Sequence, residues 1–292
     1  MHIGVWLPST EFEIDAERLV RFAEDMEGVG VSFLESSDHV LTTRLPHTHG
    51  SATLVSRGYH DPFILFAFLA PKTTLDFATS VLVLPQRPAA LVVQQLAELI
   101  WFYGDRFRFG LGSGWNAPEF AALGVEFADR GAILSEQIKV IEALWPGDYA
   151  SYVGEHHGLD QVGIAPPPPR QRPPIWFGGH SRRVLERVAR HGEGWMPLSN
   201  PSNVNLSAEL QLLRKLTEEQ GHDSADIGLE GRVVLSTSTT QDDWLRTAVA
   251  WHRLGVTHLA LTYEGGGFTD IGHVTETIQM LGERLRAILS NA

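Results

Sequence analysis

The chain of 292 residues contains no cysteine. This absence excludes disulfide bonds, thiolate zinc sites, iron–sulfur clusters and a cysteine nucleophile. Long apolar segments are missing too: the longest strongly apolar run, residues 63–70, is far shorter than the roughly 18 residues that a membrane span needs. The first residues show no basic segment followed by an apolar one, so we expect no signal peptide and a cytoplasmic protein.

Basic residues are in short supply, with 23 Lys and Arg against 35 Asp and Glu and a net charge of −12. Nucleic acids and anionic membranes are bound through basic surface, so we expect neither as a partner. The expected partner is a small molecule. An anionic one would need a local cationic or backbone-amide site.

Short apolar runs alternate with longer amphipathic segments along the whole chain. The runs predict eight strands, at residues 2–7, 31–35, 75–84, 107–111, 175–177, 194–198, 232–236 and 257–262. Each is followed by a predicted helix, at residues 15–29, from Asp61 and Pro62 onward, and at 88–102, 129–144, 181–191, 208–220, 241–254 and 271–289.

Apolar strands that alternate with helices indicate a parallel sheet covered by helices. Eight such units favour a closed (β/α)8 TIM barrel, built as one domain over residues 1–292. Two long segments, 36–60 and 146–173, interrupt the pattern, and we expect them to be functional insertion loops.

In such a barrel, ligands bind where the strands end. Asp38 and His39 follow the second strand, where His39 could donate a hydrogen bond or act as acid or base; the alternative is a loop histidine bonded by Asp38. Thr79, Ser80 and Val81 lie within the third strand. Small polar residues there suggest a bulge or backbone exposed to a flat ligand, and tolerated hydroxyls are the alternative.

Two glycine-rich turns also stand at strand ends. Gly112, Ser113 and their neighbours form alternating glycines that allow close backbone approach to a ligand, although the spacing is neither a dinucleotide fingerprint nor a Walker loop. Gly178, Gly179, His180 and Ser181 precede a helix, whose free amides suit a phosphate; simple capping by Ser181 is the alternative.

Histidine pairs at 47/49 and 156/157 could ligate a metal, but no carboxylate or third histidine has convincing spacing, so we predict no metal site. No G-x-S-x-G elbow is present, which leaves a hydrolase triad without support.

Several ordered motifs resemble those of the luciferase-like monooxygenase superfamily, and most closely the branch that uses the deazaflavin coenzyme F420. They are SDHV at 37–40, SVLVLP at 80–85, RFRFGLGSGWN at 106–116 with the following Glu119-Phe120, and PPIWFGGHS at 173–181. The match covers nearly the whole chain and weakens after about residue 200.

The resemblance implies an oxidoreductase that transfers a hydride between the deazaflavin and a small organic substrate, in a barrel that often forms homodimers. It places Thr79, Ser80 and Val81 behind the cofactor ring, often with a non-proline cis peptide. It further places Asp38 and His39 beside the ring, Gly112 and Ser113 close to the cofactor, and Gly178, Gly179, His180 and Ser181 at its phosphate.

One departure concerns the proton donor. Sugar-phosphate dehydrogenases of this family carry a glutamate just after the glycine turn, where this chain has Trp115 and Asn116. Sugar phosphate is therefore a doubtful substrate. His39 is the predicted catalytic residue, with Glu11 and Glu264 as further candidates.

Two alternatives remain open. One is an FMN-dependent monooxygenase on the same barrel, which would need oxygen and a flavin reductase as partner; the other is a non-catalytic cofactor-binding barrel. The anionic glutamate tail of F420 needs cationic neighbours, and this requirement favours the deazaflavin. The available arginines are Arg44, Arg57, Arg87, Arg182 and Arg183.

Overall fold

The computed structural model describes residues 1–8, 12, 14–42, 59–197 and 199–289. Within them, parallel strands close into a barrel in the order β1, β2, β3, β5, β8, β9, β10, β11 and back to β1, with β4 continuing β3 beside β5. This arrangement confirms the predicted (β/α)8 barrel. The strand bounds are β1 (His2–Trp6), β2 (Phe33–Ser36), β3 (Asp76–Thr79), β4 (Leu82–Val83), β5 (Phe107–Gly112), β8 (Ile175–Gly178), β9 (Gly194–Met196), β10 (Gly228–Val234) and β11 (His258–Thr262).

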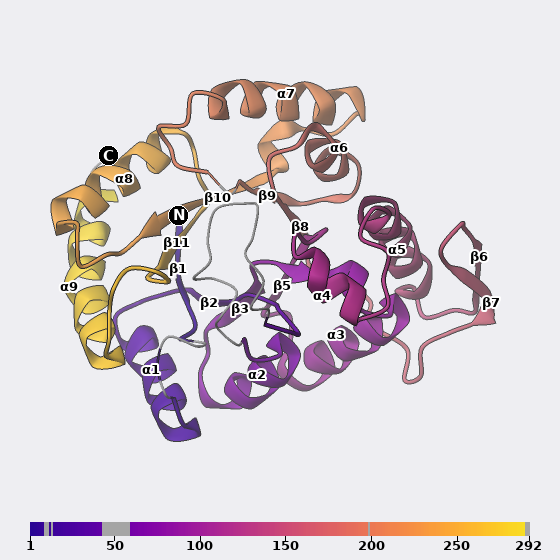
Figure 1. The fold of residues 1–292 in the computed structure, drawn as a ribbon, viewed down its shortest axis with the longest axis horizontal. Coiled ribbons are helices and arrows are strands. Elements are labelled where there is room, and N and C mark those ends of the chain that lie inside the picture. The colour runs from indigo at the N-terminus through magenta and orange to yellow at the C-terminus, as the bar shows by residue number, and fades with distance from the viewer. Residues whose placement is uncertain (9–11, 13, 43–58, 198, 290–292) are drawn as a thin grey trace.

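Helices surround the barrel (Figure 1). Local sequence sets where several begin: the Asp61 side chain accepts the Phe63 and Ile64 amides, and Ser181 accepts the Val184 amide. The helix bounds are α1 (Ala16–Gly28), α2 (Pro62–Leu69), α3 (Ala89–Tyr103), α4 (Ala117–Ala122), α5 (Arg130–Leu144), α6 (Arg182–His191), α7 (Leu206–Glu219), α8 (Gln241–Arg253) and α9 (Ile271–Leu289).

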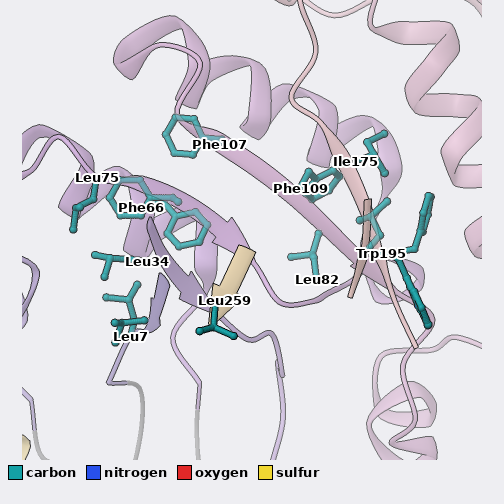
Figure 2. Packing of buried hydrophobic residues seen from close by; sticks show 14 of the residues in the cluster. Leu7, Leu34, Phe66, Leu75, Leu82, Phe107, Phe109, Ile175, Trp195 and Leu259 are labelled. Atoms are coloured by element: carbon teal, nitrogen blue, oxygen red, sulfur yellow. The ribbon is translucent and has the colours of Figure 1, made fainter. Parts of the chain in front are cut away.

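Apolar side chains fill the layer between the strands and the helices (Figure 2). Phe66 of α2 lies 5.1 Å from Phe77 of β3, and Phe77 lies 5.8 Å from Phe107 of β5, measured between ring centroids. All three rings are buried. Each stabilises the fold by about 1.5–3 kcal/mol relative to an exposed ring.

The predicted strand 75–84 is interrupted. β3 ends at Thr79 and β4 starts at Leu82, and the peptide bond between Ser80 and Val81 is a non-proline cis peptide, as the family resemblance led us to expect. The seventh barrel strand starts earlier than predicted, at Gly228. Glycines look like strand breakers in sequence, but Gly228 makes room for the Trp176 ring: an added Cβ would lie 2.3 Å from it.

The segment 146–173 is not a plain loop. It contains an antiparallel hairpin of β6 (Ala150–Val153) and β7 (Gly158–Val162), at the periphery of the molecule (Figure 1). Both strands are largely exposed, so they lack the apolar run by which the barrel strands were recognised. No helix among the described residues is long and apolar enough to cross a membrane.

The barrel interior contains a buried ionic cluster. Arg108 Nη2 donates to Glu35 at 2.7 Å and to Glu230 at 2.6 Å. Its guanidinium is stacked between Phe33 and Trp176, with ring centroids at 4.5 and 4.4 Å. Burial, followed by the charge of Glu230, raises the pKa of Glu35 well above its ordinary value. One cation thus faces two carboxyl groups, and the raised pKa favours the protonated form of Glu35.

Candidate active site

A cavity of about 410 Å³ opens at the carboxyl ends of the strands, where barrel enzymes place their ligands. Glu264, Trp6 and Trp115 contribute to its wall. Of the predicted cofactor contacts, those that line it are Asp38, His39, Ser80, Val81, Gly112, Ser113, Gly178, Gly179, His180 and Ser181. Thr79 does not: its buried hydroxyl donates to the Gly110 carbonyl at 2.7 Å.

The Ser80–Val81 peptide forms part of the cavity wall and is fixed by its neighbours. The Ser80 amide donates to the Ser36 carbonyl at 2.9 Å, and the Ser80 carbonyl accepts the Ser37 hydroxyl at 3.2 Å. Arg232 Nη2 donates to the Ser80 hydroxyl at 2.9 Å. The peptide therefore offers a rigid surface, as a planar ring would require.

The glycines around Val81 also have a packing role that the sequence did not predict. An added Cβ on Gly112 would lie 2.4 Å from Val81 Cγ2, and one on Gly178 would lie 2.7 Å from Val81 Cγ1. Both positions need glycine because the valine methyl groups fill that space. The two glycines make room for Val81, and they also line the cavity.

His39 is held by a buried carboxylate. Its Nδ1 lies 2.9 Å from Glu119 Oε2, and Glu119 Oε1 accepts the amides of Val40 at 2.6 Å and Leu41 at 3.0 Å. Asn116 Nδ2 adds a longer bond of 3.3 Å to the same carboxylate. Glu119 belongs to the short helix α4, so this helix positions the histidine.

The ionisation of Glu119 follows from these contacts. Burial raises its pKa, but the hydrogen bonds from His39 and from the Leu41 amide outweigh burial, and the net pKa lies below the ordinary value. Glu119 is therefore a carboxylate at neutral pH. Since it faces Nδ1, it stabilises the tautomer with the proton on Nδ1 and leaves Nε2 for the cavity.

Asp38 makes a different ion pair. Arg87 donates to it twice, through Nε at 3.1 Å and Nη2 at 2.7 Å, and the Val83 amide adds a bond of 3.1 Å. Arg87 Nη1 also lies 2.9 Å from Asp61. Arg87 was predicted as a cation for the cofactor tail, but two carboxylates already occupy it.

Two further side chains complete the cavity. The Tyr59 hydroxyl donates to Glu264 Oε1, and the Tyr59 ring lies 5.2 Å from the His39 ring. Arg232 packs over the Trp6 ring at 4.5 Å and brings a positive charge to the wall. These contacts place Glu264, a predicted candidate, inside the site.

At the other end of the cavity lies the turn from Gly178 to Ser181. The Gly179 amide donates to the Met196 carbonyl at 3.1 Å and is thus engaged within the barrel. Within the first turn of α6 the Val184 amide is already bonded to Ser181, so the amides of Arg182 and Arg183 are the ones that could bind an anion. The phosphate-binding prediction therefore depends on those amides, together with His180 and Ser181.

Sequence reasoning missed Glu119, Tyr59 and Arg232 as site residues. Glu119 was noticed only as part of a motif; its position three residues after Asn116, in a helix that follows a barrel strand, was the available signal.

Glu11, Arg44, Arg57 and the histidine pair 47/49 lie outside the described residues. His156 and His157 lie in the β6–β7 turn, where their amides donate to Glu136. No group of three metal-ligating side chains occurs in the described ranges.

A hydrogen-bonded peptide wall, a carboxylate-bound histidine and a helix start thus meet at one cavity in the barrel mouth. A family model described as luciferase-like monooxygenase matches residues 1–288. The chain belongs to this family, whose members are oxidoreductases or monooxygenases that use flavin or F420.

Relatives and solved structures agree with this assignment. An uncharacterized protein of Mycobacterium tuberculosis is 32% identical over 202 residues, covering 68% of this chain and 69% of its own length. An F420-dependent hydroxymycolic acid dehydrogenase of the same organism is 26% identical over 231 residues, 77% of this chain and 60% of that protein. An FMNH2-dependent dimethylsulfone monooxygenase of Pseudomonas putida is 29% identical over 175 residues, 59% of this chain and 47% of that protein.

The fold is also that of an F420-dependent secondary alcohol dehydrogenase solved with an F420-acetone adduct. The TM-score is 0.77 at 14% identity, over 96% of this chain and 97% of that one. The proteins that resemble this chain thus include both F420-dependent and FMNH2-dependent enzymes.

Proposed function

We propose that the chain is an F420-dependent oxidoreductase that transfers a hydride between the deazaflavin and a small organic substrate. The observation that carries the proposal is the pairing of His39 with the ionised Glu119 at the cavity wall. Such a pair moves a proton, and a carbonyl or alcohol substrate requires a proton to move whenever a hydride does.

The cavity suits the cofactor in size and in chemistry. About 410 Å³ lies within the usual range for small-molecule sites. The Ser80–Val81 peptide offers a flat contact, Arg232 supplies a cation, and the start of α6 supplies amide donors for a phosphate. When bound, the deazaflavin would supply a carbon centre that accepts or gives up a hydride.

His39 performs the proton step in this proposal. With Nδ1–H donated to Glu119, Nε2 accepts the proton of a substrate hydroxyl during oxidation. In the reverse direction the imidazolium donates that proton to the substrate oxygen. Glu119 stabilises the imidazolium and fixes the ring orientation, so it is a positioning residue.

The substrate side of the cavity is aromatic. The rings of Tyr59 and Trp115 lie 5.2 and 5.5 Å from the His39 ring. Trp115 stands where sugar-phosphate dehydrogenases of the family carry a glutamate, and aromatic walls favour apolar substrate groups. We infer an alcohol or carbonyl compound without a phosphate.

The test is a titration of purified protein with F420 and with FMN, followed by tryptophan fluorescence, and then turnover assays of His39→Ala. We expect tight binding of F420, weak binding of FMN, and a loss of turnover of about 10²-fold or more in the variant. His60→Ala, which changes an exposed histidine close by in sequence, is the matched control and should retain its rate. An unchanged rate in His39→Ala removes this residue from the mechanism.

The second candidate is an FMN-dependent monooxygenase. The similarity to the dimethylsulfone monooxygenase supports it. It would require reduced flavin from a reductase and would consume oxygen. Tight FMN binding with oxygen uptake supports it and contradicts the main proposal. Cofactor binding without turnover over a broad panel of alcohols and carbonyls favours a non-catalytic cofactor-binding barrel.

A further inference from the structure

A basic groove runs between α5 and α6, outside the cavity. It has a volume of about 300 Å³, and the charged side chains that line it include Lys139, Arg183, Arg187 and Arg190, with Glu186 as the opposing carboxylate. The whole chain carries a net charge of −12. A local excess of positive charge on such a protein is the kind of site that an anion needs.

The groove and the cavity are both lined by residues from the start of α6. Ser181, which caps α6, and Val184 line the cavity, and Arg183 lies between them in sequence. Arg130, the first residue of α5, donates from Nε to the Gly114 carbonyl at 3.1 Å, and Gly114 also lines the cavity. Both helices thus begin near the cavity. Figure 1 shows α5 and α6 beside each other, and the groove is lined by residues of both helices.

Three of the four arginines of α6, Arg183, Arg187 and Arg190, lie on one helix face, because their spacing is four and three residues. They span about 10 Å along the axis. Arg187 in the middle is fixed to α5, through Nε to the Ser135 hydroxyl at 3.0 Å and Nη2 to the Gly131 carbonyl at 2.7 Å. Burial, followed by the neighbouring charge of Arg183, lowers the pKa of Arg187, so this row of charges repels itself.

The nearby carboxylates pair with other residues and do not neutralise the charges of Arg183, Arg187 and Arg190. Glu186 accepts from Arg182 at 2.9 Å, and Glu142 pairs with His191 at 2.9 Å. Within the described part of the chain, Arg183, Arg187 and Arg190 form no ion pair closer than 4.0 Å. A ligand with several carboxylates would relieve their repulsion.

We propose that this groove binds the anionic tail of the cofactor, as a chain of linked glutamates that continues from the phosphate down α6. The inference rests on the proposed function, and it makes the groove a selector between cofactors, because FMN ends at its phosphate. Arg183 contacts the tail next to the phosphate and Arg190 contacts it two turns further on.

The test compares two ligands on three proteins. The ligands are F420 with several glutamates and the same deazaflavin truncated at its phosphate; the proteins are wild type, Arg183→Ala/Arg190→Ala, and the control Arg214→Ala/Arg253→Ala, whose arginines lie on α7 and α8. Dissociation constants are read from tryptophan fluorescence. Thermal unfolding verifies that all three are folded, and Lys139→Glu on α5 serves as a second variant of the groove.

We expect the double groove variant to bind full-length F420 about tenfold more weakly, and the truncated ligand within twofold of wild type. The control should bind both as wild type does. In wild type, added salt should weaken F420 more than the truncated ligand. The KM for F420 should rise in the groove variant while kcat is unchanged.

Equal effects on both ligands, or none on either, overturn the inference and leave the proposed function standing, because wild type still binds F420 and turns over. Tight binding of FMN alone by the wild type overturns the proposed function, and the inference falls with it.

Discussion

Two buried glutamates of the same barrel have pKa values shifted in opposite directions. Glu35 lies in the barrel interior at 0% exposure, and Glu119 lies at the mouth at 1%. Burial, followed by the charge of Glu230, raises the pKa of Glu35. Burial also raises the pKa of Glu119, but donated hydrogen bonds outweigh it and the net shift is downward. A low solvent exposure by itself therefore does not decide the direction in which the pKa of a carboxyl group shifts here.

The difference lies in the supply of donors. Glu119 accepts hydrogen bonds from two backbone amides in addition to its contact with His39. Backbone donors are held in place by the chain and cannot rotate away as side chains can. Glu35 accepts Trp6 Nε1 at 2.8 Å but shares Arg108 with a second carboxylate. The interior cluster is thus suited to holding the barrel together, whereas the mouth supplies a charged partner for His39.

The largest effect should come from removing the interior cation. Arg108→Met leaves Glu35 and Glu230 buried without it, and we expect a loss of about 3–5 kcal/mol in the free energy of unfolding. Urea denaturation followed by circular dichroism measures this. A loss below about 1 kcal/mol would mean that the cluster is accessible to water.

At the mouth, Glu119→Gln keeps the size of the side chain but removes its charge. We expect turnover to fall at least tenfold with little change in KM, because the imidazolium of His39 loses its stabilising partner. A change confined to KM contradicts this positioning role and indicates a substrate contact.

The two glutamates should also give pH dependences of opposite sign. A lowered pKa in the folded state means that wild type loses stability relative to Glu119→Gln as pH falls below 4.5, the ordinary value for glutamate. A raised pKa means that wild type loses stability relative to Glu35→Gln as pH rises above 4.5. Urea denaturation between pH 3.5 and 8, values chosen as roughly spanning these transitions, measures both slopes. Slopes of equal sign would refute the contrast.

The smallest effect should come from an exposed pair. Arg172 Nη2 lies 2.5 Å from Glu193, but the two side chains are 28% and 45% exposed. We expect Arg172→Met to cost at most about 1 kcal/mol, measured in the same way and serving as the control for Arg108→Met. A cost comparable to that of the interior variant would show that solvent does not screen this pair.

Much of the molecule could be predicted from sequence. The alternation of apolar runs and amphipathic segments determined the barrel, because each run forms its strand with the same local period wherever it lies. Asp61 and Ser181 determined helix starts through bonds to amides two or three residues away. The family motifs located the cis peptide at Ser80–Val81.

Only the tertiary structure decided which charges meet. His39 and Glu119 are 80 residues apart, and Asp38 and Arg87 are 49 apart; these partners depend on which strands the closed barrel makes adjacent. The same closure places Val81 against Gly112 and Gly178, so these two cavity-lining glycines also make room for a side chain. Local periodicity determines elements within one segment, whereas the packing of all segments at once determines their contacts.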